Sequence, residues 1–194
     1  RPVGRRASRP RLRRRSLERA RGTQLPLMPL RAPTRIDAMN EADLRAVAAI
    51  DPSTHIEEAP LREELGRSWS RMWVAREAFE EGEEVVGFLS AWHVADELHV
   101  LNVTTRPDRR RRGIGRALME TAVAYGRGKR VKHVLLEVRR SNHGAIALYR
   151  GIGFFATGVR ARYYPDDEDA VEMVLLFDAN TGEVIVREDE AKLD

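Results

Sequence analysis

Six consecutive residues have the composition of an anion-binding turn. They lie between an expected strand and an amphipathic helix expected from Ile114 to Tyr125, and they are Arg110, Arg111, Arg112, Gly113, Ile114 and Gly115. Glycines let the backbone approach a phosphate closely, the free amides at a helix start point at the anion, and arginines add positive charge. The turn therefore predicts a pyrophosphate site. The alternative is a basic cluster that only solvates the start of a helix.

A single carboxylate, Glu137, interrupts the apolar run from Val134 to Val138. A run of this kind predicts a buried strand. Loss of water around the side chain would favour the protonated carboxyl and suit Glu137 to general acid-base work. The alternative is a glutamate near the end of the strand that faces solvent.

Other kinds of catalytic site are disfavoured by composition. The chain has no cysteine, which excludes disulfides, thiolate metal sites and cysteine nucleophiles. Its histidines show no spacing typical of metal ligands; they are His55, His93, His99, His133 and His143. We expect no metal, and we expect these side chains to be surface or core residues.

Positive charge is concentrated at one end of the chain. Residues 1–37 hold twelve arginines and two acidic residues, a local charge of +10, so the remainder carries −6 of the total of +4. We expect residues 1–33 to be a disordered Arg/Pro-rich tail. Four interpretations of this tail remain open: it contacts a polyanion such as RNA, it is only a solvated tail, it is an upstream extension, or it is a transit peptide. An acidic domain would suit a cationic substrate.

The remaining pattern predicts alternating helices and strands in one domain over residues 34–177, followed by an acidic C-terminal extension over 178–194. Expected helices cover about 40–50, 61–70, 114–125 and 145–149, and expected strands cover 34–38, 73–78, 85–93, 98–103, 134–138, 154–162 and 170–177. The strands from 73 to 103 should form an antiparallel meander. Past Asp178 we expect a turn, a short strand over 184–186 and a frayed end. No run is apolar enough to span a bilayer, and we expect no membrane association and a cytoplasmic location.

These motifs resemble those of the GNAT acetyltransferases. The cofactor motif of that family is Arg or Gln, two residues, Gly, one residue, then Gly or Ala, which residues 110–115 match, and the later motifs follow in the family's order over residues 34–177. The resemblance implies an α/β (α+β) GNAT fold, with a mixed central sheet of about six to seven strands, an antiparallel first half and about four flanking helices. It also implies acetyl-CoA as co-substrate.

A narrower resemblance rests on Glu137, Asn142, Tyr149 and the run Arg160 to Pro165. These residues are similar to those of RimI-type enzymes, which acetylate the N-terminal alanine of a small-subunit ribosomal protein. The resemblance implies Glu137 as proton acceptor and Tyr149 as proton donor to the thiolate leaving group. Tyr149 could instead only pack on its helix.

The resemblance also implies binding residues. Cofactor binding falls on the 110–115 turn and on Val103, Thr104, Thr105, Arg116 and Asn142. Asn142 should also cap a helix. Tyr163 and Tyr164 should either line the peptide groove or pack under the sheet, and the acidic run Asp166 to Asp169 could attract a basic N-terminus.

The sequence therefore predicts an acetyl-CoA-dependent N-terminal acetyltransferase whose partner is the basic N-terminus of a ribosomal protein. Two alternatives remain open. One is an acetyltransferase for a small amine or a lysine side chain, and the other is a non-catalytic acyl-CoA-binding or RNA-associated module.

Overall fold

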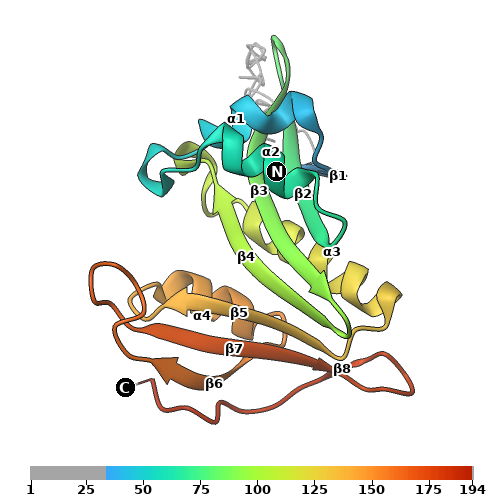
Figure 1. The fold of residues 1–194 in the computed structure, drawn as a ribbon, viewed down its shortest axis with the longest axis vertical. Helices are drawn as coiled ribbons and strands as arrows, with labels where there is room; N and C mark the ends of the chain where they lie inside the picture. Colours follow the sequence, from blue (N-terminus) through green and yellow to red (C-terminus); the bar gives the residue numbers. More distant parts are fainter. Residues whose placement is uncertain (1–33, 194) are drawn as a thin grey trace, which may run out of the picture. The chain divides into compact units, whose positions relative to one another are not determined.

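Eight strands and four α-helices make up residues 34–193, the part of the chain that this computed structural model describes (Figure 1). The strands are β1 (Arg35–Ala38), β2 (Ser70–Phe79), β3 (Gly82–Val94), β4 (Glu97–Thr105), β5 (His133–Arg139), β6 (Phe155–Arg160), β7 (Ala170–Phe177) and β8 (Val184–Ile185). The helices are α1 (Leu44–Ala48), α2 (Glu58–Leu65), α3 (Ile114–Lys129) and α4 (His143–Arg150). The expected Arg/Pro-rich tail lies outside the described residues.

All strands join one sheet in the order β1-β2-β3-β4-β5-β7-β6, with β8 beside β7. Every neighbouring pair is antiparallel except β4 and β5, which run parallel. The antiparallel first half and the four helices are confirmed. The sheet has eight strands, against about six to seven expected for the central sheet, because the short strand expected over 184–186 also pairs with β7.

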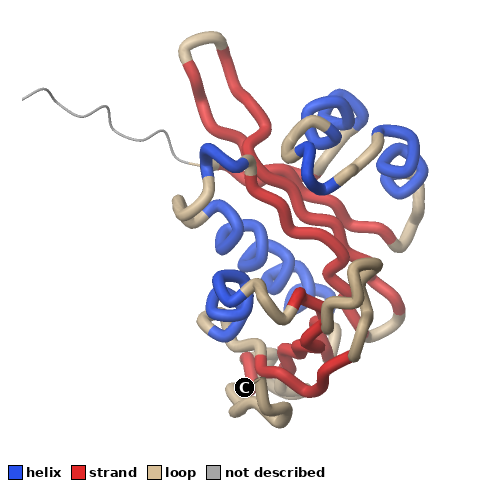
Figure 2. Tube along the Cα trace, turned by 90° about the vertical axis from the view of Figure 1, so that its left-hand side faces the viewer, coloured by secondary structure: helices blue, strands red, loops and turns tan. Residues whose placement is uncertain are grey.

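Helices cover both faces of this sheet (Figure 2). α3 and α4 bury one core against strands β2 to β7, with Leu118 and Met119 of α3 fully buried there. On the opposite face, α1 and α2 bury a smaller core around Phe88. Strand β3 contributes to both cores, as expected for a strand whose side chains alternate between two covered faces.

The two halves of the sheet meet along a short parallel contact between β4 and β5. Pairing extends only from Glu97 to Val100 on β4 and from His133 to Leu136 on β5. A bulge at Leu101 shifts the register of β4 against β3, so that Ser90 pairs with Asn102 and Ala91 with Val100. Beyond this point β4 and β5 diverge (Figure 1). Backbone groups on the open side of residues 101–105 therefore lack the partners that a neighbouring strand would provide.

Gly87 allows α3 to pack directly on β3. A Cβ at this position would lie 2.8 Å from Ile114 Cγ2, 3.1 Å from the Thr104 carbonyl and 3.2 Å from Leu118 Cδ1. We expect Gly87→Ala to lower the free energy of unfolding by about 1–3 kcal/mol, because the first turn of α3 must move away from the sheet. Urea unfolding measures this loss. Gly66→Ala is the control, since its Cβ would meet only the carbonyls of Glu63 and Arg62, at 3.5 and 3.8 Å; equal stability of the two variants would contradict the account.

The C-terminal end is held against the sheet, so the expectation of a frayed end is wrong for the described residues. The amides of Glu190 and Ala191 both donate to the Ala156 carbonyl, at 2.8 and 3.2 Å, and Asp189 accepts from the Ala156 amide at 2.8 Å. Leu193 packs against the larger core. Among residues 34–193, no helix has the length and apolar content needed to cross a membrane.

Candidate active site

The predicted anion-binding turn forms the start of the 16-residue helix α3. Gly113 is the N-cap with φ +85°, in the left-handed region that favours glycine. Apart from its chain neighbours, no described residue has a heavy atom within 4 Å of the place that a Cβ on Gly113 would occupy. No side chain caps the helix. Its first-turn amides therefore keep their donors for a ligand, and the positive end of the helix dipole adds to their pull on an anion.

Two of the predicted arginines border this turn without an ion-pair partner among the described residues. Arg111 and Arg112 are both exposed. Arg111 reaches toward the start of α4: its Nη1 and the Oδ1 of Asn142 each lie 3.9 Å from the place a Cβ on Gly144 would occupy. Asn142 caps α4 by accepting from the Ala145 amide at 3.1 Å, which confirms the predicted cap.

The other two arginines make structural contacts. Arg110 donates to the Thr105 carbonyl at 3.3 Å and pairs with Asp51, in the connection between α1 and α2. Hydrogen bonds from Ser53, together with Arg110, lower the pKa of Asp51. Arg116 donates to the Gly151 carbonyl at 3.2 Å, beside the end of α4. The structure thus leaves Arg111 and Arg112 available for a phosphate.

The predicted residues Val103, Thr104 and Thr105 lie where β4 has left β5, and within the described residues 34–193 they pair with β3 alone. The start of α3 lies against this segment, since a Cβ on Gly115 would be 3.8 Å from Thr105 Oγ1. Ile114 is buried and anchors the helix. Free amides at the helix start, open backbone groups on β4 and two unpaired arginines form a donor set that fits the pyrophosphate and pantetheine amides of acetyl-CoA.

Gly113→Ala is expected to raise the dissociation constant for CoA about 10-fold, because alanine at φ +85° is strained and its methyl group occupies the space beside the amides. Isothermal titration calorimetry measures the constant. Gly128→Ala, at the other end of α3 and also with open space around it, is the matched control. Equal affinities for CoA in the two variants would exclude this turn as the phosphate site.

Glu137 differs from the expectation of a desolvated carboxylate. Strand alternation places Leu136 and Val138 in the core and Glu137 on the opposite face of β5, where its side chain keeps 35% of its exposure. It pairs with Arg160 at 3.5 Å. The prediction of a buried position was wrong because only every second residue of β5 faces the helices. Exposure on this face leaves the carboxylate accessible to an incoming amine.

Tyr149 lies near the end of α4 and is 8% exposed. Its ring centroid is 5.9 Å from that of Phe154. Burial, together with the charge of Tyr164, raises the pKa of Tyr149 to about 12. The phenol is therefore protonated at neutral pH and able to donate a proton.

The connection between β6 and β7 carries the two predicted substrate-binding tyrosines. Tyr163 is 46% exposed, which favours the groove over packing under the sheet, and Tyr164 is half-buried. Their rings meet edge to face at 5.2 Å. The Arg139 guanidinium lies 4.1 Å from the centroid of the Tyr164 ring and fixes its position.

The acidic run in this connection is partly neutralised within the protein, which the sequence pattern did not indicate. Arg139 pairs with Asp166 at 2.9 Å and with Glu168 at 2.6 Å. Hydrogen bonds from Ser141, together with Arg139, lower the pKa of Glu168 to about 2. Asp169 pairs with Arg140 at 3.3 Å. The run therefore offers less charge to a basic peptide than its composition indicates.

Tyr164 has electrostatic interactions with two other predicted site residues. The pKa of Tyr164 is raised first by burial and also by Glu137, while Tyr164 itself acts on Tyr149. Tyr164 thus interacts electrostatically with Glu137 of β5 and with Tyr149 of α4, although it lies in the β6–β7 connection. Sequence reasoning missed the structural roles of Asp51, Arg139, Arg160 and Glu172, which depend on contacts across the fold.

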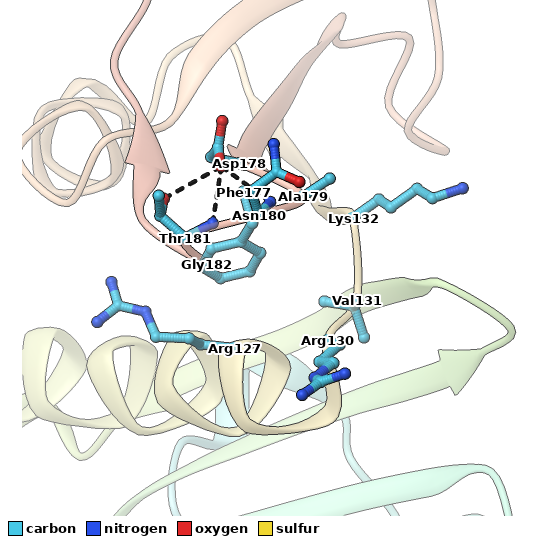
Figure 3. Close-up of a pocket in the computed structure, with 10 residues that line it drawn as sticks. All are labelled: Arg127, Arg130, Val131, Lys132, Phe177, Asp178, Ala179, Asn180, Thr181 and Gly182. Carbon is cyan, nitrogen blue, oxygen red and sulfur yellow. Dashed lines mark hydrogen bonds between the residues drawn. The ribbon is translucent and has the colours of Figure 1, made fainter.

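A hollow of about 560 Å³ lies at the opposite end of α3 (Figure 3). Arg127 and Arg130, at the end of α3, line one side of it, and Asp178, which accepts from the amides of Asn180 and Thr181, lies on the other; Lys132 also lines the hollow. Basic side chains at a helix C-terminus complement the helix dipole. The hollow contains none of the predicted site residues.

The chain belongs to the acetyltransferase (GNAT) family, whose sequence profile matches residues 37–154. The ribosomal protein bS18-alanine N-acetyltransferase of Escherichia coli strain K12 is 42% identical over 85 residues, which are 42% of this chain and 57% of that relative. The chain thus spans little more than half of its length. The N-alpha-acetyltransferase RimI of Mycobacterium tuberculosis is 31% identical over 143 residues, covering 68% of this chain and 85% of the relative.

A solved structure has the same fold. The ribosomal-protein-S18-alanine N-acetyltransferase from Escherichia coli superposes with a TM-score of 0.66 at 28% identity, covering 81% of this chain and 97% of that one. The predicted fold class and family are therefore confirmed. The family match ends at residue 154, before the connection that carries Tyr163 and Tyr164.

Proposed function

We propose that this protein transfers the acetyl group of acetyl-CoA to the α-amine of an N-terminal alanine, on a small-subunit ribosomal protein. The observation that carries the proposal is the uncapped start of α3 at Gly113, which lies against the part of β4 that no longer pairs with β5. Similarity to N-terminal alanine acetyltransferases supports the acceptor.

Acetyl-CoA supplies an acetyl group activated as a thioester. The first-turn amides of α3, with Arg111 and Arg112, would hold its pyrophosphate, and Asn142, which lies near Arg111, would add a hydrogen bond. The open backbone groups of residues 103–105 would bind the pantetheine arm. These contacts would orient the thioester toward the gap between the two strands.

An α-amine has a reference pKa near 8 and attacks only when it is neutral. Glu137 would accept its proton, directly or through a water molecule, from the exposed face of β5. Tyr149, whose pKa is about 12, would donate its proton to the departing CoA thiolate. The base on β5 would thus act on the attacking amine, and the acid on α4 would act on the departing thiolate.

The acceptor would enter across the face that carries Glu137 and Tyr163. Its N-terminus would be basic, since its ammonium group would meet a carboxylate there.

Contact of the Arg-rich segment 1–33 with a polyanion is a separate proposal. Its test is the salt dependence of RNA binding by the full chain and by a chain that begins at Met28.

The proposal is tested by incubating the protein with acetyl-CoA and a panel of peptides. An alanine-initiated ribosomal peptide should gain one acetyl group at its N-terminus, located by tandem mass spectrometry. The same peptide with a blocked N-terminus and a free lysine is the control. If the protein acetylates a small polyamine but no peptide N-terminus, the small-amine alternative replaces this proposal. Tight CoA binding without turnover of any amine would favour a non-catalytic module.

A further inference from the structure

Two carboxylates share one guanidinium on the proposed acceptor face. Glu137 of β5 and Glu172 of β7 are directly opposite each other in the antiparallel pair, so both side chains project from the same face of the sheet. Arg160, at the end of β6, contacts both of them. The three side chains leave a net charge of −1, which is what a single ammonium group would balance.

The guanidinium is not shared equally. Arg160 Nε donates to Glu172 Oε1 in a hydrogen bond of 2.7 Å, whereas its Nη1 lies 3.5 Å from Glu137 Oε1. The ring of Tyr163 supports the guanidinium from the side, with 5.5 Å between the guanidinium carbon and the ring centroid. Glu172 therefore neutralises Arg160, and the unbalanced negative charge remains on Glu137.

Gly158 makes room for this arrangement. It is paired with Glu172 across β6 and β7, next to a register shift, and a Cβ at position 158 would lie 2.5 Å from Glu172 Oε2. Any larger residue would displace the carboxylate from its place beside Arg160. The glycine at position 158 of β6 thus allows the short ion pair between Arg160 and Glu172 to form.

We propose that Glu172 is a positioning residue, which holds Arg160 away from Glu137 and so keeps the Glu137 carboxylate open to the α-ammonium group of the acceptor. Without Glu172, Arg160 would pair fully with Glu137 and compete with the acceptor for it. This inference rests on the proposed role of Glu137 in N-terminal acetylation, and it adds a group that determines how the acceptor amine binds.

Steady-state kinetics with an alanine-initiated ribosomal peptide tests the proposal. In Glu172→Gln we expect KM for the peptide to rise about 10-fold, because an internal cation now occupies the binding carboxylate. Arg160→Gln alone should not raise KM, since it removes the competitor. The double variant should return KM to near the wild-type value, which loss of structure at Glu172 could not do.

Three further variants complete the test. Glu172→Asp should retain most of the affinity for the peptide, and Gly158→Ala should raise KM without any change in charge. Glu183→Gln, an exposed carboxylate in the β7–β8 connection, is the matched control. The inference is overturned if Glu172→Gln leaves KM unchanged, or if Arg160→Gln fails to rescue it. Full activity of Glu137→Gln would instead overturn the proposed function, so the two failures are distinguishable.

Discussion

Glu137→Gln is expected to slow N-terminal acetylation by about 10²- to 10⁴-fold, because the amide cannot accept the proton that the attacking amine must lose. The Glu137 side chain is partly exposed and makes one ion pair, with Arg160 at 3.5 Å. Exposed pairs of this kind contribute little to folding. The loss should therefore appear in kcat, with the dissociation constant for CoA largely unchanged.

The measurement compares kcat and CoA affinity in the wild type, Glu137→Gln and a matched control. Glu81→Gln serves as the control, since Glu81 is an exposed carboxylate in the turn between β2 and β3. A strongly reduced kcat with unchanged CoA affinity in Glu137→Gln assigns the proton-accepting role to Glu137. A rate for Glu137→Gln equal to that of Glu81→Gln would remove Glu137 from the mechanism.

Tyr149→Phe should reduce kcat by about 10²- to 10⁴-fold as well, because no phenolic proton is then available for the departing thiolate. Phenylalanine preserves the ring that packs against Phe154. We therefore expect an unchanged melting temperature, so that reduced activity reports on the proton and not on the fold.

The pH dependence gives a second measurement on Tyr149. Its folded pKa of about 12 lies above the reference of about 10 for a free phenol. The proton remains on Tyr149 as pH rises from 7 to 10, so loss of this donor does not reduce the rate in that range. An alkaline decline near pH 10 that disappears in Tyr149→Phe would show that Tyr149 titrates at its ordinary value and contradict the assignment.

Local patterns predicted the parts of the site that are built within one segment. The glycine-containing turn before α3, the Asn142 cap and the order of strands and helices each depend on residues a few positions apart. Gly113 adopts the left-handed conformation that such a turn requires. These features were therefore recoverable from the sequence, even though their functional roles remain predictions.

Contacts between distant segments were not recoverable in this way. The opposition of Glu137 and Glu172 depends on the register between β5 and β7, and the pairing of Arg110 with Asp51 joins residues 59 positions apart. Charge composition indicated an acidic attraction at Asp166 and Glu168, but both carboxylates pair with Arg139. A sequence shows which charges are present, whereas the fold determines which of them have partners.

The C-terminal segment has a consequence for association between molecules. Strand β6 lies at the edge of the sheet, and an open edge can recruit a strand from another chain. Both backbone hydrogen-bonding groups of Ala156 are engaged by residues 189–191. The chain thus protects its own sheet edge at this point, because its own segment occupies the backbone groups that a strand from another chain would need.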